Sequence, residues 1–136
     1  MSDLLPISLV KQIAARAAEA AAAIGCPMSI VVVDSGANLV YAERMDNALL
    51  AGIEVARRKA RSAVLFNRPT KVFEDMLAGG RMAILTLPDA VPLEGGIPLI
   101  SNGKLAGGIG ISGGSAQQDG QVAAASVETF ARLIQS

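Results

Sequence analysis

A glycine-rich run at residues 105–120, LAGGIGISGGSAQQDG, has the spacing most often associated with phosphate binding. Gly108, Gly110 and Gly113 fit G-x-G-x-x-G, the pattern that lets a backbone approach a pyrophosphate. A dinucleotide site also needs a second parallel strand ending in an acidic residue about 20 positions further on. Only 23 residues follow Gly113, and they have the pattern of one helix. No Gly-Lys-Ser/Thr closes the run, so neither a dinucleotide site nor a P-loop is predicted.

The strand at the start of this run has one nearly bare face. Aliphatic residues alternate with Gly108 and Gly110 in LAGGIGI, so the glycine side carries almost no side chain. A bare strand face indicates the close approach of a packed helix, a neighbouring subunit or a flat ligand. All three remain open from the sequence.

The turn SGGS at residues 112–115 precedes the last helix. Ser115 and Gln118 have capping-box spacing, so the helix is predicted to start there. Free N–H groups at a helix start can hold a carboxylate or phosphate. The glycine run therefore supplies most of the candidate ligand-binding residues: Gly108, Gly110, Ser112, Gly113, Gly114, Ser115 and Gln118.

Charged residues near predicted element ends add further candidates. Arg44, at the end of a strand, could clamp a carboxylate bidentately or pair with Asp46 or a partner chain. Glu94, before Gly95 and the ligand-binding candidate Gly96, could move a proton if partly buried. Two further candidate catalytic residues have ordinary alternatives. Asp119 could be a first-turn helix residue, and Lys59 one more solvated cation among alanines and arginines.

Composition excludes several classes of function. The absence of histidine removes His-based triads and most zinc sites. Cys26 is the only cysteine, which fits a reducing compartment. Charge is balanced, with 12 Lys and Arg against 12 Asp and Glu, so no nucleic-acid partner is predicted. No apolar run approaches the ~20 residues of a membrane span, and no signal peptide is evident. A cytoplasmic protein without a membrane partner is expected.

The predicted elements form one α+β domain over residues 1–136. Small residues, alanine and 14 glycines, dominate the apolar fraction and aromatics are few, so homo-oligomer formation is expected to add buried area. Asn102-Gly103 is a strong hairpin signal, and residues 34–38 mark a second hairpin. Helices are predicted over residues 7–25, 46–66, 70–77 and 115–136, and strands over 29–33, 39–45, 81–87, 97–101 and 104–112.

Five segments in order resemble the GlcG/HbpS-type family, which includes the C-terminal domain of PduO-type proteins. They are VVVDSGANLV, ERMDNA, ARRKARSAVLF, LEGGIPLI and LAGGIGISGGSAQQD, and they span nearly the whole chain. The resemblance implies a profilin-like sandwich, with an antiparallel sheet of about five strands and flanking helices. It also implies homo-oligomers, from dimers up to octamers. Members are similar to proteins that bind or degrade heme, and others accompany catabolic operons or are described as tautomerases.

The sequence departs from this family in its potential iron ligands. Without histidine, heme iron could be held only by a methionine, Tyr41, Cys26 or a hydroxyl such as Thr70. Ala37 stands where a second glycine is expected, and Gly120 where a glutamate often is.

Three functions follow from the sequence. The first is an oligomeric protein that binds heme or another flat or carboxylate-bearing small molecule. The second is a small cofactor-free enzyme of tautomerase or isomerase type that acts on an organic acid. In it, Arg44 and the SGGS amides hold the acid while Glu94 or Asp119 moves a proton. The third is a structural oligomer without a ligand.

Overall fold

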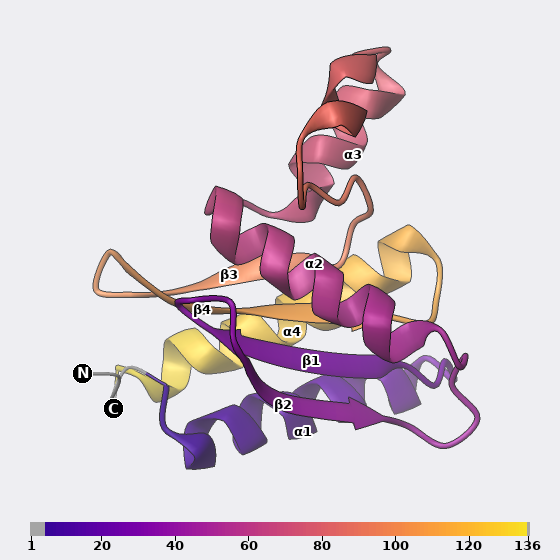
Figure 1. Ribbon diagram of the computed structural model, residues 1–136. Coiled ribbons are helices and arrows are strands. Elements are labelled where there is room, and N and C mark those ends of the chain that lie inside the picture. The colour runs from indigo at the N-terminus through magenta and orange to yellow at the C-terminus, as the bar shows by residue number, and fades with distance from the viewer. Residues whose placement is uncertain (1–4, 136) are drawn as a thin grey trace.

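Four strands form one antiparallel sheet in the order β2-β1-β4-β3 in the computed structural model of the protein (Figure 1). The structure describes residues 5–135. Antiparallel pairing of β1 with β2 and of β3 with β4 confirms both predicted hairpins. The strands are β1 (Ser29–Asp34), β2 (Leu39–Arg44), β3 (Gly96–Ser101) and β4 (Lys104–Ser112).

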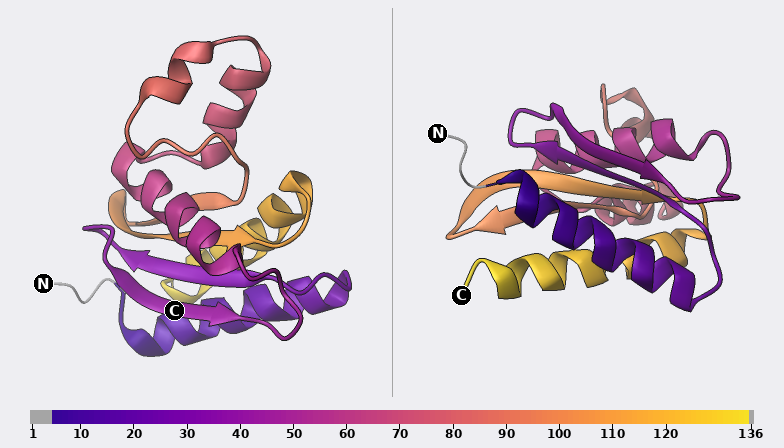
Figure 2. Two further views of the ribbon diagram at one scale, coloured as in Figure 1. Left: turned by 45° about the vertical axis from the view of Figure 1, so that its right-hand side comes forward. Right: turned by 90° about the horizontal axis from the view of Figure 1, so that it is seen from below.

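Helices cover both faces of this sheet. Helices α1 (Ile7–Ala23) and α4 (Ala116–Leu133) pack side by side on one face, and α2 (Gly52–Phe66) lies across the other (Figure 2). Beyond α2, helix α3 (Thr70–Ala78) and the short 3-10 helix η1 (Met82–Thr86) form an arm that extends away from the sheet (Figure 1). The fold class predicted from the sequence, an α+β sandwich on an antiparallel sheet, is confirmed.

The helices on both faces of the sheet explain why β1 has a continuous run of apolar residues. Successive side chains of a strand point to opposite faces. Ile30 and Val32 therefore join the core under α1 and α4, while Val31 and Val33 join a smaller core under α2. A strand buried on both faces is apolar at every position, as this one is.

The bare face of β4 is in contact with α2. A Cβ built on Gly108 would lie 2.8 Å from Val64 Cγ2, and one built on Gly110 would collide with the backbone oxygen of Ala56. Of the three explanations open from the sequence, close helix packing is the one realised. The face of Gly108 and Gly110 has no room for a flat ligand within the subunit.

The predicted strand at residues 81–87 is wrong, and the sheet has four strands rather than about five. These residues form η1, in which Ile84 is buried while Met82 and Leu85 are exposed. A short apolar run has the same pattern in a strand and in a buried helical turn, so periodicity could not separate them. No helix within residues 5–135 is both long enough and apolar enough to span a bilayer.

Candidate functional site

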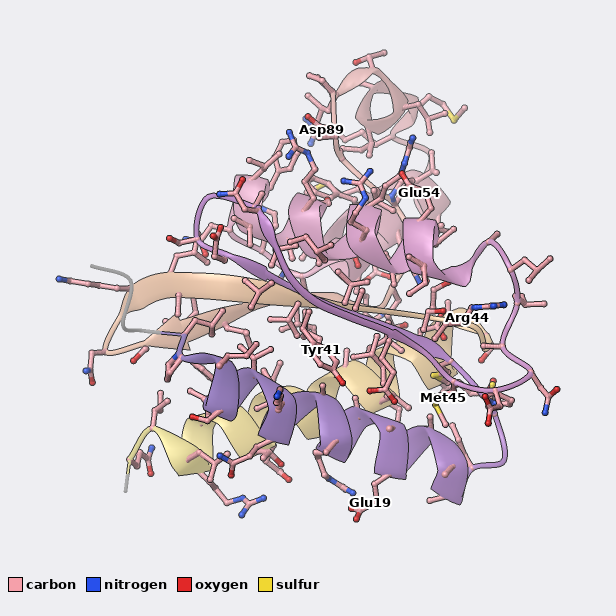
Figure 3. The ribbon with its side chains drawn as sticks, turned by 60° about the horizontal axis from the view of Figure 1, so that its bottom comes forward. Glu19, Tyr41, Arg44, Met45, Glu54 and Asp89 are labelled. Carbon is pink, nitrogen blue, oxygen red and sulfur yellow. The ribbon has the colours of Figure 1, made fainter. Side chains whose placement is uncertain are left out.

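A cavity of about 560 Å³ opens between the C-terminal end of α1 and the end of β2. Its volume falls in the range of roughly 300–1,000 Å³ that is typical of small-molecule sites. In Figure 3, Arg44 and Met45 lie at this end of β2, with Met45 towards α1 and the Arg44 side chain directed away from α1. We call it the α1–β2 cavity. Its lining residues are Ala18, Ala22, Gly25, Cys26, Pro27, Glu43, Arg44, Met45 and Asp46.

Local backbone geometry brings the two walls of the α1–β2 cavity together. Helix α1 ends at Ala23, and Gly25 takes a φ of 67°, a conformation that favours glycine at a helix end. The chain then enters β1, where Ser29 pairs with Arg44. This pairing places the loop between α1 and β1, which contains Cys26, beside the end of β2.

The α1–β2 cavity combines a cation with two sulfur atoms. Arg44 is exposed, whereas Cys26 and Met45 are half-buried. Cys26 Sγ lies 3.7 Å from the carbonyl oxygen of Gly113, and Met45 Sδ accepts the N–H of Met28 at 3.4 Å. Arg44 lies at the rim, where its guanidinium could reach a carboxylate carried by a ligand. The two sulfurs are soft donors suited to iron.

Tyr41 and Thr70, two of the iron ligands considered from the sequence, have other partners. The Tyr41 hydroxyl donates to Glu43 Oε1 at 2.9 Å, and this bond raises the pKa of Tyr41. Thr70 Oγ1 is buried and accepts the N–H of Gly96 at 2.9 Å. Among residues 5–135, no group of three or more His, Cys, Asp or Glu side chains could hold a metal ion.

Lys59 and Asp119 form a buried ion pair. Lys59 is 2% exposed and Asp119 is 3% exposed. Lys59 Nζ lies 2.8 Å from Asp119 Oδ2 and donates to the Ile111 carbonyl at 2.9 Å. The interpretation of Lys59 as a solvated cation is therefore wrong. Sequence spacing missed this because the partners lie on different helices, 60 positions apart.

Two N–H groups of the SGGS turn are already engaged. Gly114 N donates to Asp119 Oδ1 at 2.8 Å, and Ser115 N donates to Gln118 Oε1 at 2.9 Å. Gln118 N donates to Ser115 Oγ, which completes the predicted capping box. The carboxylate at this helix start is thus the chain's own Asp119, in the place where an external anion was expected.

Three glycines near the ion pair stand where a side chain would collide with it or with neighbouring residues. Gly95 has a φ of 129°, and a Cβ there would lie 2.9 Å from Lys59 Nζ. A Cβ on Gly96 would lie 2.8 Å from Thr70 Cγ2. The half-buried Glu94 side chain lies against Gly120, in space that a residue larger than glycine would need.

The predicted site residues form two separate groups. Glu94, Lys59 and Asp119 gather with Gly96, Gly113, Gly114, Ser115 and Gln118 near one end of β3 and β4. Arg44 lies at the same end of the sheet but on β2, across the sheet from β3. Ser112 lies between Arg44 and the group around Lys59 and Asp119, since Ser29 pairs with both Arg44 and Ser112. Three strand spacings, roughly 14 Å, separate the two edges.

Sequence reasoning named Cys26 and the methionines as possible iron ligands, but it did not place Cys26 and Met45 together in one cavity. Neither had a local signal, because Cys26 and Met45 become neighbours only through the pairing of β1 with β2.

One antiparallel sheet with helices on both faces, and a cavity at one sheet edge, defines an α+β domain of the HbpS type. The family model described as "Haem degrading protein HbpS-like" matches residues 5–128, so the chain belongs to this family. Protein GlcG of Escherichia coli (strain K12) is 39% identical over 85 residues, covering 62% of this chain and 63% of GlcG. This match therefore spans less than two thirds of that relative.

Solved structures resemble the chain over nearly its full length. The crystal structure of a PduOC:heme complex has a TM-score of 0.84 and 30% identity, covering 92% of this chain and 94% of that one. The crystal structure of HbpS has a TM-score of 0.83 and 34% identity, covering 91% and 88%. Klebsiella pneumoniae protein ORFY has a TM-score of 0.86 and 26% identity, covering 93% and 90%.

Proposed function

We propose that this protein binds heme, or another flat ligand that carries carboxylates, in the α1–β2 cavity. The observation that carries the proposal is the lining of that cavity, in which Arg44 accompanies the sulfurs of Cys26 and Met45. The likeness to PduOC, whose structure was solved with heme, supports the choice of ligand.

The residues present fit heme without histidine. Cys thiolate and Met thioether both serve as axial ligands of heme iron. Cys26 is the better candidate, because its hydrogen bond to the Gly113 carbonyl is long, at 3.7 Å, whereas Met45 Sδ accepts the N–H of Met28 at 3.4 Å. Arg44, at the exposed rim, would hold a propionate. Bound heme would supply a redox-active iron, while the protein's residues bind and orient it.

Hemin titration of tag-free protein, followed in the Soret band, tests the proposal. A His-tag must be absent because it would supply the imidazole that this chain lacks. We expect saturable binding near one heme per subunit, a changed Soret position in Cys26→Ser, and weaker binding in Arg44→Gln. Met82→Leu and Arg16→Gln, which lie outside the cavity, are the matched controls. No saturable shift, or equal losses in the controls, would refute the assignment.

We also propose that the protein acts as a homo-oligomer of two to eight subunits. The support is the set of exposed apolar side chains on the arm and before α2: Leu49, Leu50, Met82, Leu85, Leu87 and Leu93. Leu49 and Leu50 precede α2 and the other four side chains follow α3, so the exposed apolar residues lie at two places. Exposed apolar patches are typical of association surfaces. Light scattering after size exclusion tests this. We expect an oligomer for the wild type and smaller species for Leu85→Asp; a monomeric wild type contradicts it.

The enzymatic alternative has less support. Asp119 is buried in an ion pair, and neither Asp119 nor Glu94 lines the α1–β2 cavity with Arg44. A proton-transfer group has to lie within hydrogen-bond reach of the bound acid. If no ligand binds in the titration above, the function of a structural oligomer gains support.

A further inference from the structure

A second cavity, of about 390 Å³, lies on the side of α2 away from the sheet. Helix α2 covers the sheet face opposite α1, so this cavity is separate from the α1–β2 cavity. Figure 3 shows Glu54 and Asp89 on this side of the molecule, with side-chain nitrogens between them. We call it the arginine cleft. It is lined by Arg57, Arg58, Arg61, Asp89, Ala90 and Val91.

The arginine cleft has more donors than its own carboxylates satisfy. Glu54 accepts two bonds from Arg57, at 3.1 and 2.7 Å, and one from Arg58, at 3.1 Å. Arg61 Nε lies 3.5 Å from Asp89 Oδ1, which is long for a charge-assisted hydrogen bond. Three guanidinium groups, each with five N–H donors, thus face two carboxylates. The cluster has a net positive charge.

The loop of residues 89–91, which forms the wall of the cleft opposite the arginines, is held in place. Val91 N donates to Ser62 Oγ at 3.1 Å, and Ser62 is a fully buried residue of α2. Prolines at positions 88 and 92 restrict the backbone of this loop. Asp89 has a φ of 67°, a left-handed conformation that Asp and Asn adopt more readily than most residues. The cleft therefore exists before any ligand enters.

We propose that the arginine cleft binds a small molecule with two neighbouring anionic groups, either phosphates or carboxylates. Arg61 and Arg57 lie one helical turn apart, so their guanidinium groups can hold two anionic groups of one ligand. Asp89 competes with the ligand for Arg61. Binding here is independent of the α1–β2 cavity and of the proposed heme function.

Calorimetric titration of the full-length, tag-free protein at low salt, with pyrophosphate and separately with succinate, tests the cleft. We expect saturable binding of at least one probe, and the tighter probe identifies the anion type. Arg61→Gln should weaken binding at least about tenfold, since it removes charged hydrogen bonds. Asp89→Asn should tighten it about two- to fivefold, because an exposed competitor is lost while the left-handed backbone is retained.

Arg16 and Glu19 provide matched controls on α1. Arg16 is ion-paired with Glu19, and its side chain is 39% exposed against 40% for Arg61. Arg16→Gln and Glu19→Gln change the net charge in the same way and should leave the affinity unchanged. The proposal is overturned if neither probe binds saturably, or if the control variants shift affinity as much as the cleft variants do. Hemin binding should be the same with and without the probe.

Discussion

Lys59 Nζ and Asp119 Oδ2 lie 2.8 Å apart and join α2 to the first turn of α4 in the interior. The two helices lie on opposite faces of the sheet, so the pair connects the layers at the end of β4, where Lys59 also bonds the Ile111 carbonyl. Asp119 in turn accepts the Gly114 N–H and fixes the SGGS turn. Lys59, Asp119 and the SGGS turn, which the sequence suggested as a ligand site, therefore connect two helices inside the protein.

Removing one partner of this pair should strongly destabilise the fold. Asp119→Ala leaves the Lys59 ammonium buried without its counter-charge, which costs about 3–5 kcal/mol. Urea unfolding measures this. Asp75→Ala, which breaks the exposed Lys71–Asp75 pair, is the control and should leave the free energy of unfolding nearly unchanged. Similar values for both variants would show that Lys59 and Asp119 are solvated.

Gly110→Ala should lower stability through a backbone collision. The new Cβ would strike the carbonyl of Ala56 in α2, so helix and sheet would have to move apart, at a cost of about 1–3 kcal/mol. Thermal melting followed by circular dichroism measures the loss. Gly79→Ala is the control, because a Cβ there would meet Asp75 O at an ordinary 3.5 Å. An unchanged melting temperature for Gly110→Ala would mean that α2 does not pack closely on β4.

Ser29→Ala should stabilise the protein. Ser29 Oγ is fully buried and has no hydrogen-bond partner among the described residues. Removing an unsatisfied buried hydroxyl should raise the free energy of unfolding by about 1 kcal/mol. Ser62→Ala should instead lower the free energy of unfolding, since the Ser62 hydroxyl accepts the Val91 N–H. A loss of stability in Ser29→Ala would point to an ordered water bound by this hydroxyl.

Glu54 should stabilise the fold in a defined pH window. Hydrogen bonds from Arg57, and then from Arg58, lower the pKa of Glu54 from 4.5 to about 2. A carboxyl with a depressed folded-state pKa contributes stability above its unfolded pKa and loses it as the pH falls through the folded value. The stability gap between wild type and Glu54→Gln should therefore hold above pH 4.5 and close towards pH 2. An NMR titration that gives Glu54 an ordinary pKa would contradict this.

The sequence by itself determined the local elements of this protein. Asn102-Gly103 specified the β3–β4 hairpin because both residues take positive φ, at 51° and 75°. Ser115 and Gln118 specified the start of α4 through reciprocal side-chain bonds. These features depend on residues a few positions apart, so their spacing along the chain is enough to predict them.

Only the tertiary structure decided what the chemically interesting residues do. The partner of Lys59 lies 60 positions away, and Gly110 meets α2 because the helix crosses the sheet there. Arg44 was predicted as a carboxylate clamp, but its neighbours Cys26 and Met45 follow from the pairing of β1 with β2. Burial and long-range contact decide whether a charge is solvated, paired or free for a ligand, and spacing along the chain records neither.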